Sequence, residues 1–129
     1  MSMTAISTTK APLAIGPYVQ GVTFGNMVIT SGQLPINPET KVMDDDVAEQ
    51  TIQSLTNAVA IVREAGLEPR HIVKTTVFVK DLNEFSKINA AYEAFFEAHS
   101  APFPARSCVE VARLPMDAKV EIEVIAVLQ

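Results

Sequence analysis

Apolar and polar residues are arranged along the chain in short stretches with distinct periodicities, and each stretch predicts one element. Near the N-terminus, the apolar runs 19–24 and 27–31 are separated only by Gly25 and Asn26, a pair that tolerates positive φ and closes hairpins. These runs predict two antiparallel strands. A further strand over residues 4–8 is expected if that segment also pairs.

Helical periodicity is clearest between the acidic run 44–46 and Gly66. Aspartate favours the N-terminus of a helix, whereas glycine and the following Pro69 favour its end, so the pattern predicts a helix between them. Its apolar stripe recurs at steps of four and three residues and consists of Ala48, Ile52, Leu55, Val59 and Val62.

A strand and a second helix are predicted next. Residues 72–80 contain the β-branched and aromatic residues that are typical of strands. After them, Asp81 or Asn83 can cap a helix that is expected to end near His99. The apolar stripe of this helix consists of Phe85, Ile88, Tyr92 and Phe95.

Two C-terminal strands complete the predicted order. They are expected over residues 106–112 and 120–128, separated by a turn. The order is then βββαβαββ at most, which predicts an α+β fold with two helices packed on one face of a mixed sheet. Residues 1–129 are too few for two cores of useful size, so we expect a single domain.

The last strand also carries information about assembly. One of its faces is entirely apolar, with Val120, Ile122, Val124, Ala126 and Leu128. The other is half apolar, with Glu121, Glu123, Ile125 and Val127. Because two helices cover only one side of a sheet, we expect another copy of the chain to cover part of the other side.

Composition and charge exclude several classes of protein. The formal net charge of -5 provides no broad basic surface, which argues against nucleic acid as a partner. A lone cysteine excludes an internal disulfide, and no His, Cys, Asp and Glu cluster has metal-binding spacing, so no metal is expected. We find no apolar run typical of a signal sequence or a membrane span, which predicts a cytoplasmic protein with no membrane partner.

The segment 103–115 contains the most informative candidates for chemistry. Strand alternation places Arg106, Cys108 and Glu110 on one face, and Glu121 of the last strand is expected to face them. An arginine on a rigid strand suits the recognition of a carboxylate, and a neighbouring glutamate can handle protons or position water. From spacing alone, however, a structural ion pair between Arg106 and Glu121 is favoured.

Other candidates have an ordinary structural interpretation beside the functional one. Cys108 has no histidine nearby in sequence, so a small apolar role is favoured over a nucleophile, and His71 and His99 are expected at surface ends of elements. Tyr18 follows a tight bend but is more often a packing residue.

Three polar or small residues likewise have both a structural and a functional interpretation. Ser31 is interpreted either as a turn former or as a site residue, and Gly32 would allow a ligand to approach the backbone. Asn89 is either a buried polar group or a boundary residue beside the stripe of the second helix.

Taken in order, these segments resemble the RidA family, also called the YjgF family, from Ala11 to Leu128. The resemblance rests on AIGPYVQG (14–21), GNMVITSGQLP (25–35), IVKTTVFVKDLNEF (72–85), NAAYEAFF (89–96), FPARSCVEVARLP (103–115) and KVEIEVIAV (119–127). The visible departure is Thr40-Lys41-Val42, where many relatives carry a glycine after the threonine, which puts the conformation of that loop in doubt.

The resemblance implies a chorismate-mutase-like fold, a homotrimer whose sheets line a central barrel, and ligand clefts between subunits. It implies hydrolysis of 2-aminoacrylate and related 2-imino acids to 2-keto acids and ammonia, without a cofactor. Arg106 would bind the substrate carboxylate and Glu121 would hold the attacking water. The residues that would line the remaining cleft are Tyr18, Ser31, Gly32, Asn89 and Cys108.

A rival hypothesis from another class is a regulatory trimer that binds a 2-keto acid without turnover. The same arginine would serve both functions, and the sequence does not separate them. RNA cleavage and chaperone-like holding, which are linked to some relatives, also stay open, although the acidic charge argues against the first.

Overall fold

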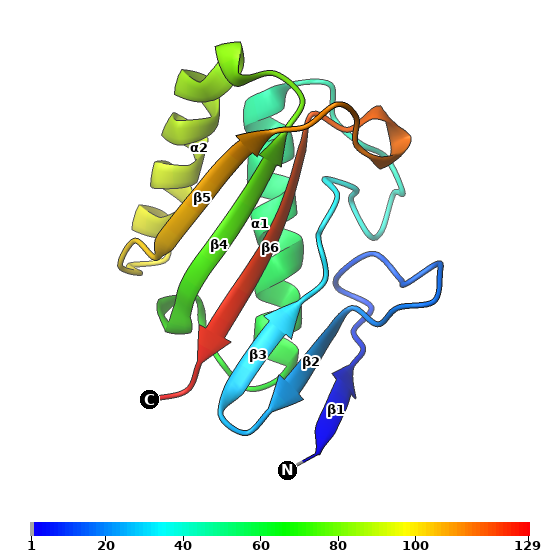
Figure 1. Cartoon of the computed structure of the whole chain (residues 1–129), viewed down its shortest axis with the longest axis vertical. Coiled ribbons are helices and arrows are strands. Elements are labelled where there is room, and N and C mark those ends of the chain that lie inside the picture. The colour runs from blue at the N-terminus through cyan, green and yellow to red at the C-terminus, as the bar shows by residue number, and fades with distance from the viewer. Residues whose placement is uncertain (1) are drawn as a thin grey trace.

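The computed structural model describes residues 2–129, and its elements follow the order βββαβαββ (Figure 1). The strands are β1 (Met3–Ile6), β2 (Gly21–Phe24), β3 (Met27–Thr30), β4 (Ile72–Val79), β5 (Ala105–Glu110) and β6 (Val120–Val127). The helices are α1 (Val47–Glu64) and α2 (Phe85–Ala98). The predicted α+β class is therefore confirmed. The strand predicted over 19–24 is shorter than expected, because its pairing begins only at Gly21.

The six strands form one mixed sheet in the order β1-β2-β3-β6-β4-β5. Neighbouring strands are antiparallel except β4 and β5, which are parallel and are connected through α2. Both helices lie behind the sheet in the view of Figure 1, so one face is covered and the other is free of helices. This confirms the predicted arrangement of two helices on one face.

The face of the sheet that lacks helices is partly apolar. The residues of β6 that the helices bury are Val120, Ile122, Val124 and Ala126. The alternate residues of β6 point away from the helices, and one of them, Ile125, pairs with Ile29 of β3, which is 40% exposed. Leu128, predicted on the buried side, lies beyond the end of β6 and is exposed.

Helix α1 begins where the acidic run predicted it. The side chain of Asp46 accepts a hydrogen bond from the backbone N–H of Glu49 at 3.0 Å, which satisfies one of the free donors of the first turn. The buried side of the helix departs from the predicted stripe, because Ala48 and Ile52 are only partly buried. Polar residues are buried instead among the apolar ones, namely Gln50, Thr51, Ser54 and Asn57.

Two of these buried polar residues attach loops to the helix. The amide nitrogen of Asn57 donates to the carbonyls of Leu34 at 3.0 Å and Ile36 at 2.9 Å. The side-chain oxygen of Gln50 accepts from the backbone N–H of Lys119 at 2.8 Å. Because their polar atoms have partners, these amides are tolerated in the core. Asn57 attaches the loop after β3 to α1, and Gln50 attaches the segment before β6.

The second helix also differs slightly from its prediction. Asp81 caps a single 3-10 turn over Leu82–Glu84, and the α-helix proper starts at Phe85 and has His99 as its C-cap. Among residues 2–129, no helix combines the length and the apolar character needed to traverse a lipid bilayer.

The loop at Thr40-Lys41-Val42, whose conformation the sequence left in doubt, contains a tight turn. Lys41 has a φ of 64°, in the left-handed region where glycine is less strained. Its backbone N–H donates to the carbonyl of Asn37 at 2.8 Å, and the side chain of Asn37 accepts from the N–H groups of Glu39 and Thr40. The turn is therefore formed with a lysine in the left-handed region.

Gln20 fixes the N-terminal loop that follows β1. Its side-chain oxygen accepts from the N–H of Thr8 at 2.7 Å. Its amide nitrogen donates to the carbonyls of Thr8, Ala11 and Pro12 at 3.0, 3.2 and 2.8 Å. The side chain is buried, so these backbone groups depend on it for their hydrogen bonds.

Gln20→Leu is expected to lower the free energy of unfolding by about 2 to 4 kcal/mol, because it leaves buried backbone groups without partners. Urea unfolding at fixed protein concentration measures the change. Glu93→Ala, on the exposed side of α2, is the control and should change stability by less than about 0.5 kcal/mol. A loss for Gln20→Leu as small as that of the control would contradict the role of Gln20.

Candidate active site

The predicted site residues lie in two groups on opposite faces of the sheet. Thr75 of β4 is buried beneath the helices and pairs with Arg106 of β5, so Arg106 is on the helix-covered face. Glu121 of β6 pairs with Phe78, which is three residues beyond Thr75 and therefore on the free face. The expectation that Glu121 faces Arg106 is wrong within one chain, because strand alternation separates them.

Arg106 is held by neutral groups. Its Nη1 donates to Oδ1 of Asn89 at 2.7 Å, and Asn89 is half-buried on α2. The guanidinium carbon lies 4.9 Å from the ring centroid of Tyr92 and 5.5 Å from that of Phe85. The ion pairs found in residues 2–129 involve other arginines. The interpretation of Arg106 and Glu121 as a structural ion pair is therefore wrong within one chain, and no carboxylate of residues 2–129 pairs with Arg106 there.

The geometry around Cys108 does not favour covalent chemistry. Burial raises the pKa of the thiol above its ordinary 9.0, although Arg106 partly opposes the rise, so the thiol is neutral at neutral pH. Nδ1 of His71 accepts from the backbone N–H of Glu68, and His99 bonds the carbonyl of Phe95. His71 is buried, so its predicted surface position is wrong. The described residues contain no group of three or more His, Cys, Asp or Glu that could hold a metal ion.

The other predicted residues line a cavity of about 750 Å³ on the other side of the molecule. They are Tyr18, Ser31, Gly32 and Glu121. Most of the remaining wall is apolar and includes Leu13, Ile15, Leu34, Ile36, Pro115 and Met116. Glu121 is the acidic residue of this lining.

Tyr18 and Ser31 are positioned by the loops at the cavity. Tyr18 is 49% exposed, and its hydroxyl accepts from the N–H of Ile15 at 3.5 Å, so its interpretation as a packing residue is wrong for the single chain. The hydroxyl of Ser31 donates to the carbonyl of Val19 at 2.5 Å, and its N–H donates to Gln20 at 2.8 Å. Ser31 therefore lines the cavity and is bonded to the segment before β2, so its interpretation as a turn former is wrong.

Gly32 leaves room for the carboxyl group of Glu121. A Cβ at position 32 would lie 3.0 Å from both Cδ and Oε2 of Glu121, so a larger residue would displace that group. Burial raises the pKa of Glu121 above its ordinary 4.5, and the carboxylate of Glu123 raises it further. A carboxylate of raised pKa takes up a proton more readily, as a general base requires.

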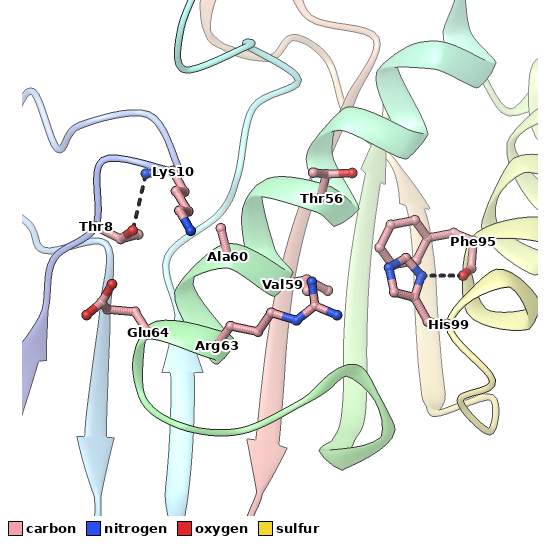
Figure 2. A pocket seen from close by; sticks show the side chains of 9 residues that line it. All are labelled: Thr8, Lys10, Thr56, Val59, Ala60, Arg63, Glu64, Phe95 and His99. Atoms are coloured by element: carbon pink, nitrogen blue, oxygen red, sulfur yellow. Dashed lines mark hydrogen bonds between the residues drawn. The ribbon is translucent and has the colours of Figure 1, made fainter.

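A second hollow contains none of the predicted site residues. Figure 2 shows it beside α1, between the N-terminal segment and the end of α2. Its volume is about 380 Å³, and it is lined by Thr8, Lys10, Thr56, Val59, Ala60, Arg63, Glu64, Phe95 and His99. The candidate active site therefore consists of the Arg106 group and the Glu121 cavity.

The sequence pattern did not identify two aromatic residues that contact Arg106 as site residues. Phe85 and Tyr92 fit the apolar stripe of the second helix, which predicts core packing and nothing more. One signal was present, because a tyrosine in a buried stripe needs a partner for its hydroxyl. The apolar wall of the cavity carried no signal, since its residues come from separate loops.

The chain belongs to the endoribonuclease L-PSP family, which includes RidA and YjgF, and the family profile matches residues 8–128. It is 67% identical over 122 residues, 95% of each chain, to the 2-iminobutanoate/2-iminopropanoate deaminase of Escherichia coli strain K12. The recognised family and the fold class are thereby confirmed.

Solved structures agree with this assignment. The crystal structure of the YjgF gene product from E. coli has a TM-score of 0.97 and 64% identity, covering 98% of this chain and 99% of the other. The crystal structure of E. coli TdcF with bound serine has a TM-score of 0.96 and 55% identity, with the same coverage.

Glu121→Gln is expected to raise the free energy of unfolding at neutral pH. Because the pKa of Glu121 is raised by folding, ionisation of this group destabilises the fold as the pH rises through its folded pKa. The gain should shrink toward zero below pH 4.5, where the carboxyl group is protonated in both states. Thermal unfolding across this pH range measures it, and a gain that stays constant at low pH would contradict the raised pKa.

Proposed function

We propose that this chain is a 2-iminobutanoate/2-iminopropanoate deaminase, which hydrolyses reactive 2-imino acids and their enamine tautomers, such as 2-aminoacrylate, to 2-keto acids and ammonia. The 67% identity to the E. coli deaminase supports this activity. The observation that carries the proposal is the guanidinium of Arg106, which is held by an amide and two aromatic rings. A cation with neutral neighbours keeps its charge for an anionic ligand such as a carboxylate.

In the proposed reaction, Arg106 binds the substrate carboxylate and Glu121 holds a water molecule. Glu121 accepts a proton from this water as the oxygen bonds to the imine carbon, and it passes the proton to the nitrogen to give a carbinolamine. Glu121 then moves the hydroxyl proton to the amino group, the C–N bond breaks, and ammonia leaves as the 2-keto acid forms. Such acid–base assistance is typically worth about a hundred- to ten-thousand-fold in rate.

Few groups suffice for this chemistry, and no cofactor is needed. The imine carbon is already electrophilic, so the protein mainly binds, orients and delivers water. In this proposal Tyr18, Ser31, Asn89 and Cys108 line the rest of the cleft, and the backbone beside Gly32 approaches the ligand. The relative that binds serine supports a ligand of amino-acid size.

We also infer a homotrimer with clefts between subunits. Arg106 and Glu121 lie on opposite faces of one chain, so a cleft that holds both must take them from different copies. The partly apolar free face around Ile29 and Ile125 would be buried by the same contact. Residues 1–129 then act as a single domain in the cytoplasm, with small 2-imino or 2-keto acids as partners.

Arg106→Ala is expected to abolish hydrolysis of 2-iminobutanoate while leaving the fold intact. Loss of a bidentate, charge-assisted interaction should lower kcat/KM by at least about a hundredfold. Release of 2-ketobutyrate above the spontaneous rate measures activity, and circular dichroism measures folding. The exposed Arg70→Ala is the control and should retain full activity. Near-normal turnover by Arg106→Ala would overturn the proposed anchor.

The alternative is a regulatory trimer that binds 2-keto acids without turnover. The wild-type protein decides between the two, because a deaminase accelerates loss of the imine, whereas a sensor shows saturable binding of 2-ketobutyrate with no acceleration. RNA cleavage, which the family description names, is not favoured by a chain of net charge -5.

A mixture of two inactive variants tests whether the cleft is shared. Arg106→Ala and Glu121→Gln should each be inactive alone, because every cleft lacks one group. Mixed trimers refolded from equal amounts should recover about one quarter of wild-type activity, since one cleft in four takes both intact residues from different subunits. Mixing without refolding is the control. No recovery in trimers shown to be mixed would exclude a cleft built from two subunits.

A further inference from the structure

The aromatic ring beneath Arg106 is itself held in place. Tyr92 lies on α2, is 5% exposed, and presents its ring to the guanidinium, whose carbon is 4.9 Å from the ring centroid. Cation–π contacts of this kind are stronger where water is excluded. Because the ring carries no net charge, it attracts the guanidinium without neutralising it.

The hydroxyl of Tyr92 is bonded to the strand next to Arg106. It lies 2.6 Å from Oγ1 of Thr75, which is completely buried on β4. Thr75 is the residue of β4 that pairs with Arg106 in the parallel β4–β5 ladder. The threonine therefore fixes the ring, and the ring contacts the arginine, so the three residues join β4, α2 and β5 at one point.

Core packing alone does not require these two hydroxyl groups. Tyr92 also packs on Phe96, with ring centroids 4.9 Å apart, and a phenylalanine beside a valine would fill nearly the same space. Two buried hydroxyls stabilise a core by little more than such an apolar pair, since each must first lose its hydrogen bonds to water. Burial also raises the pKa of Tyr92, so the phenol is neutral and contributes no charge beside Arg106.

We propose that Tyr92, fixed by Thr75, is a positioning residue that aims the Arg106 guanidinium at the substrate carboxylate while leaving its charge uncompensated. This inference rests on the proposed role of Arg106 as the carboxylate anchor. Asn89 holds one edge of the guanidinium, and the ring of Tyr92 holds its face. The pair Tyr92 and Thr75 thereby sets the affinity of the site for the anionic end of the ligand.

The test compares a carboxylate ligand with its uncharged amide. Affinities of 2-ketobutyrate and 2-oxobutanamide are measured by calorimetry for the wild type, Tyr92→Leu, Tyr92→Phe and Thr75→Val. Tyr92→Leu removes the ring face and should weaken 2-ketobutyrate binding about 3- to 30-fold while leaving 2-oxobutanamide unchanged. Tyr92→Phe and Thr75→Val keep the aromatic ring but remove the hydrogen bond that fixes it. Each should weaken binding of 2-ketobutyrate by a smaller factor and leave binding of 2-oxobutanamide unchanged.

Two further variants separate positioning from packing. In Thr75→Val/Tyr92→Phe both hydroxyls are gone, so thermal stability should return toward the wild type while the preference for the carboxylate stays reduced. In an Arg106→Ala background, Tyr92→Leu should cause no further change in binding. If Tyr92→Leu does not fold, Tyr92→Phe and the double variant still provide the comparison, because both retain the ring.

The outcomes distinguish this inference from the function on which it rests. A wild-type protein that binds the amide as tightly as the carboxylate would refute Arg106 as the anchor. A wild type that prefers the carboxylate, together with folded Tyr92 and Thr75 variants that keep the full preference, would refute only the positioning role.

Discussion

Side chains at successive positions of a strand point to opposite faces of the sheet, and this alternation controls how the site is divided. Because α1 and α2 cover the same face, Arg106 emerges on the covered side, beside α2, and meets an amide and two rings. Glu121 emerges on the free side, in a cavity that loops enclose. One chain therefore carries these two groups on opposite faces, and the chemistry that we propose for them requires a contact between copies.

The fold could be predicted because its main signals are local. The helix start at Asp46 and the hairpin at Gly25 depend on residues adjacent in sequence. The buried polar side of α1 could not be predicted, because Gln50 and Asn57 are satisfied by loop atoms that are distant in sequence. Apolar periodicity identifies only apolar residues. It therefore does not detect a buried amide whose hydrogen-bond partners are distant in sequence.

The sequence named candidate site residues but did not predict how they are arranged in space. Strand alternation correctly grouped Arg106 with Cys108, which pair with Thr75 and Val77 on the covered face. The position of Glu121 relative to them depends on strand register, and a shift of one residue exchanges the two faces. The environment of Arg106 could not be predicted from the sequence either. An aromatic residue on a buried stripe gives the same sequence pattern whether it fills space or contacts a cation.

The place of β6 has a consequence for how the chain is made. It is the last strand in sequence, yet it lies between β3 and β4 and joins the N-terminal hairpin to the rest of the sheet. Until β6 has been synthesised, β3 and β4 each have an unpaired edge, and neither half of the sheet has its central neighbour. All of the pairing between β3 and β6 is made by residues 125–127, so loss of this short stretch would remove the ladder that joins the N-terminal hairpin to the rest of the sheet.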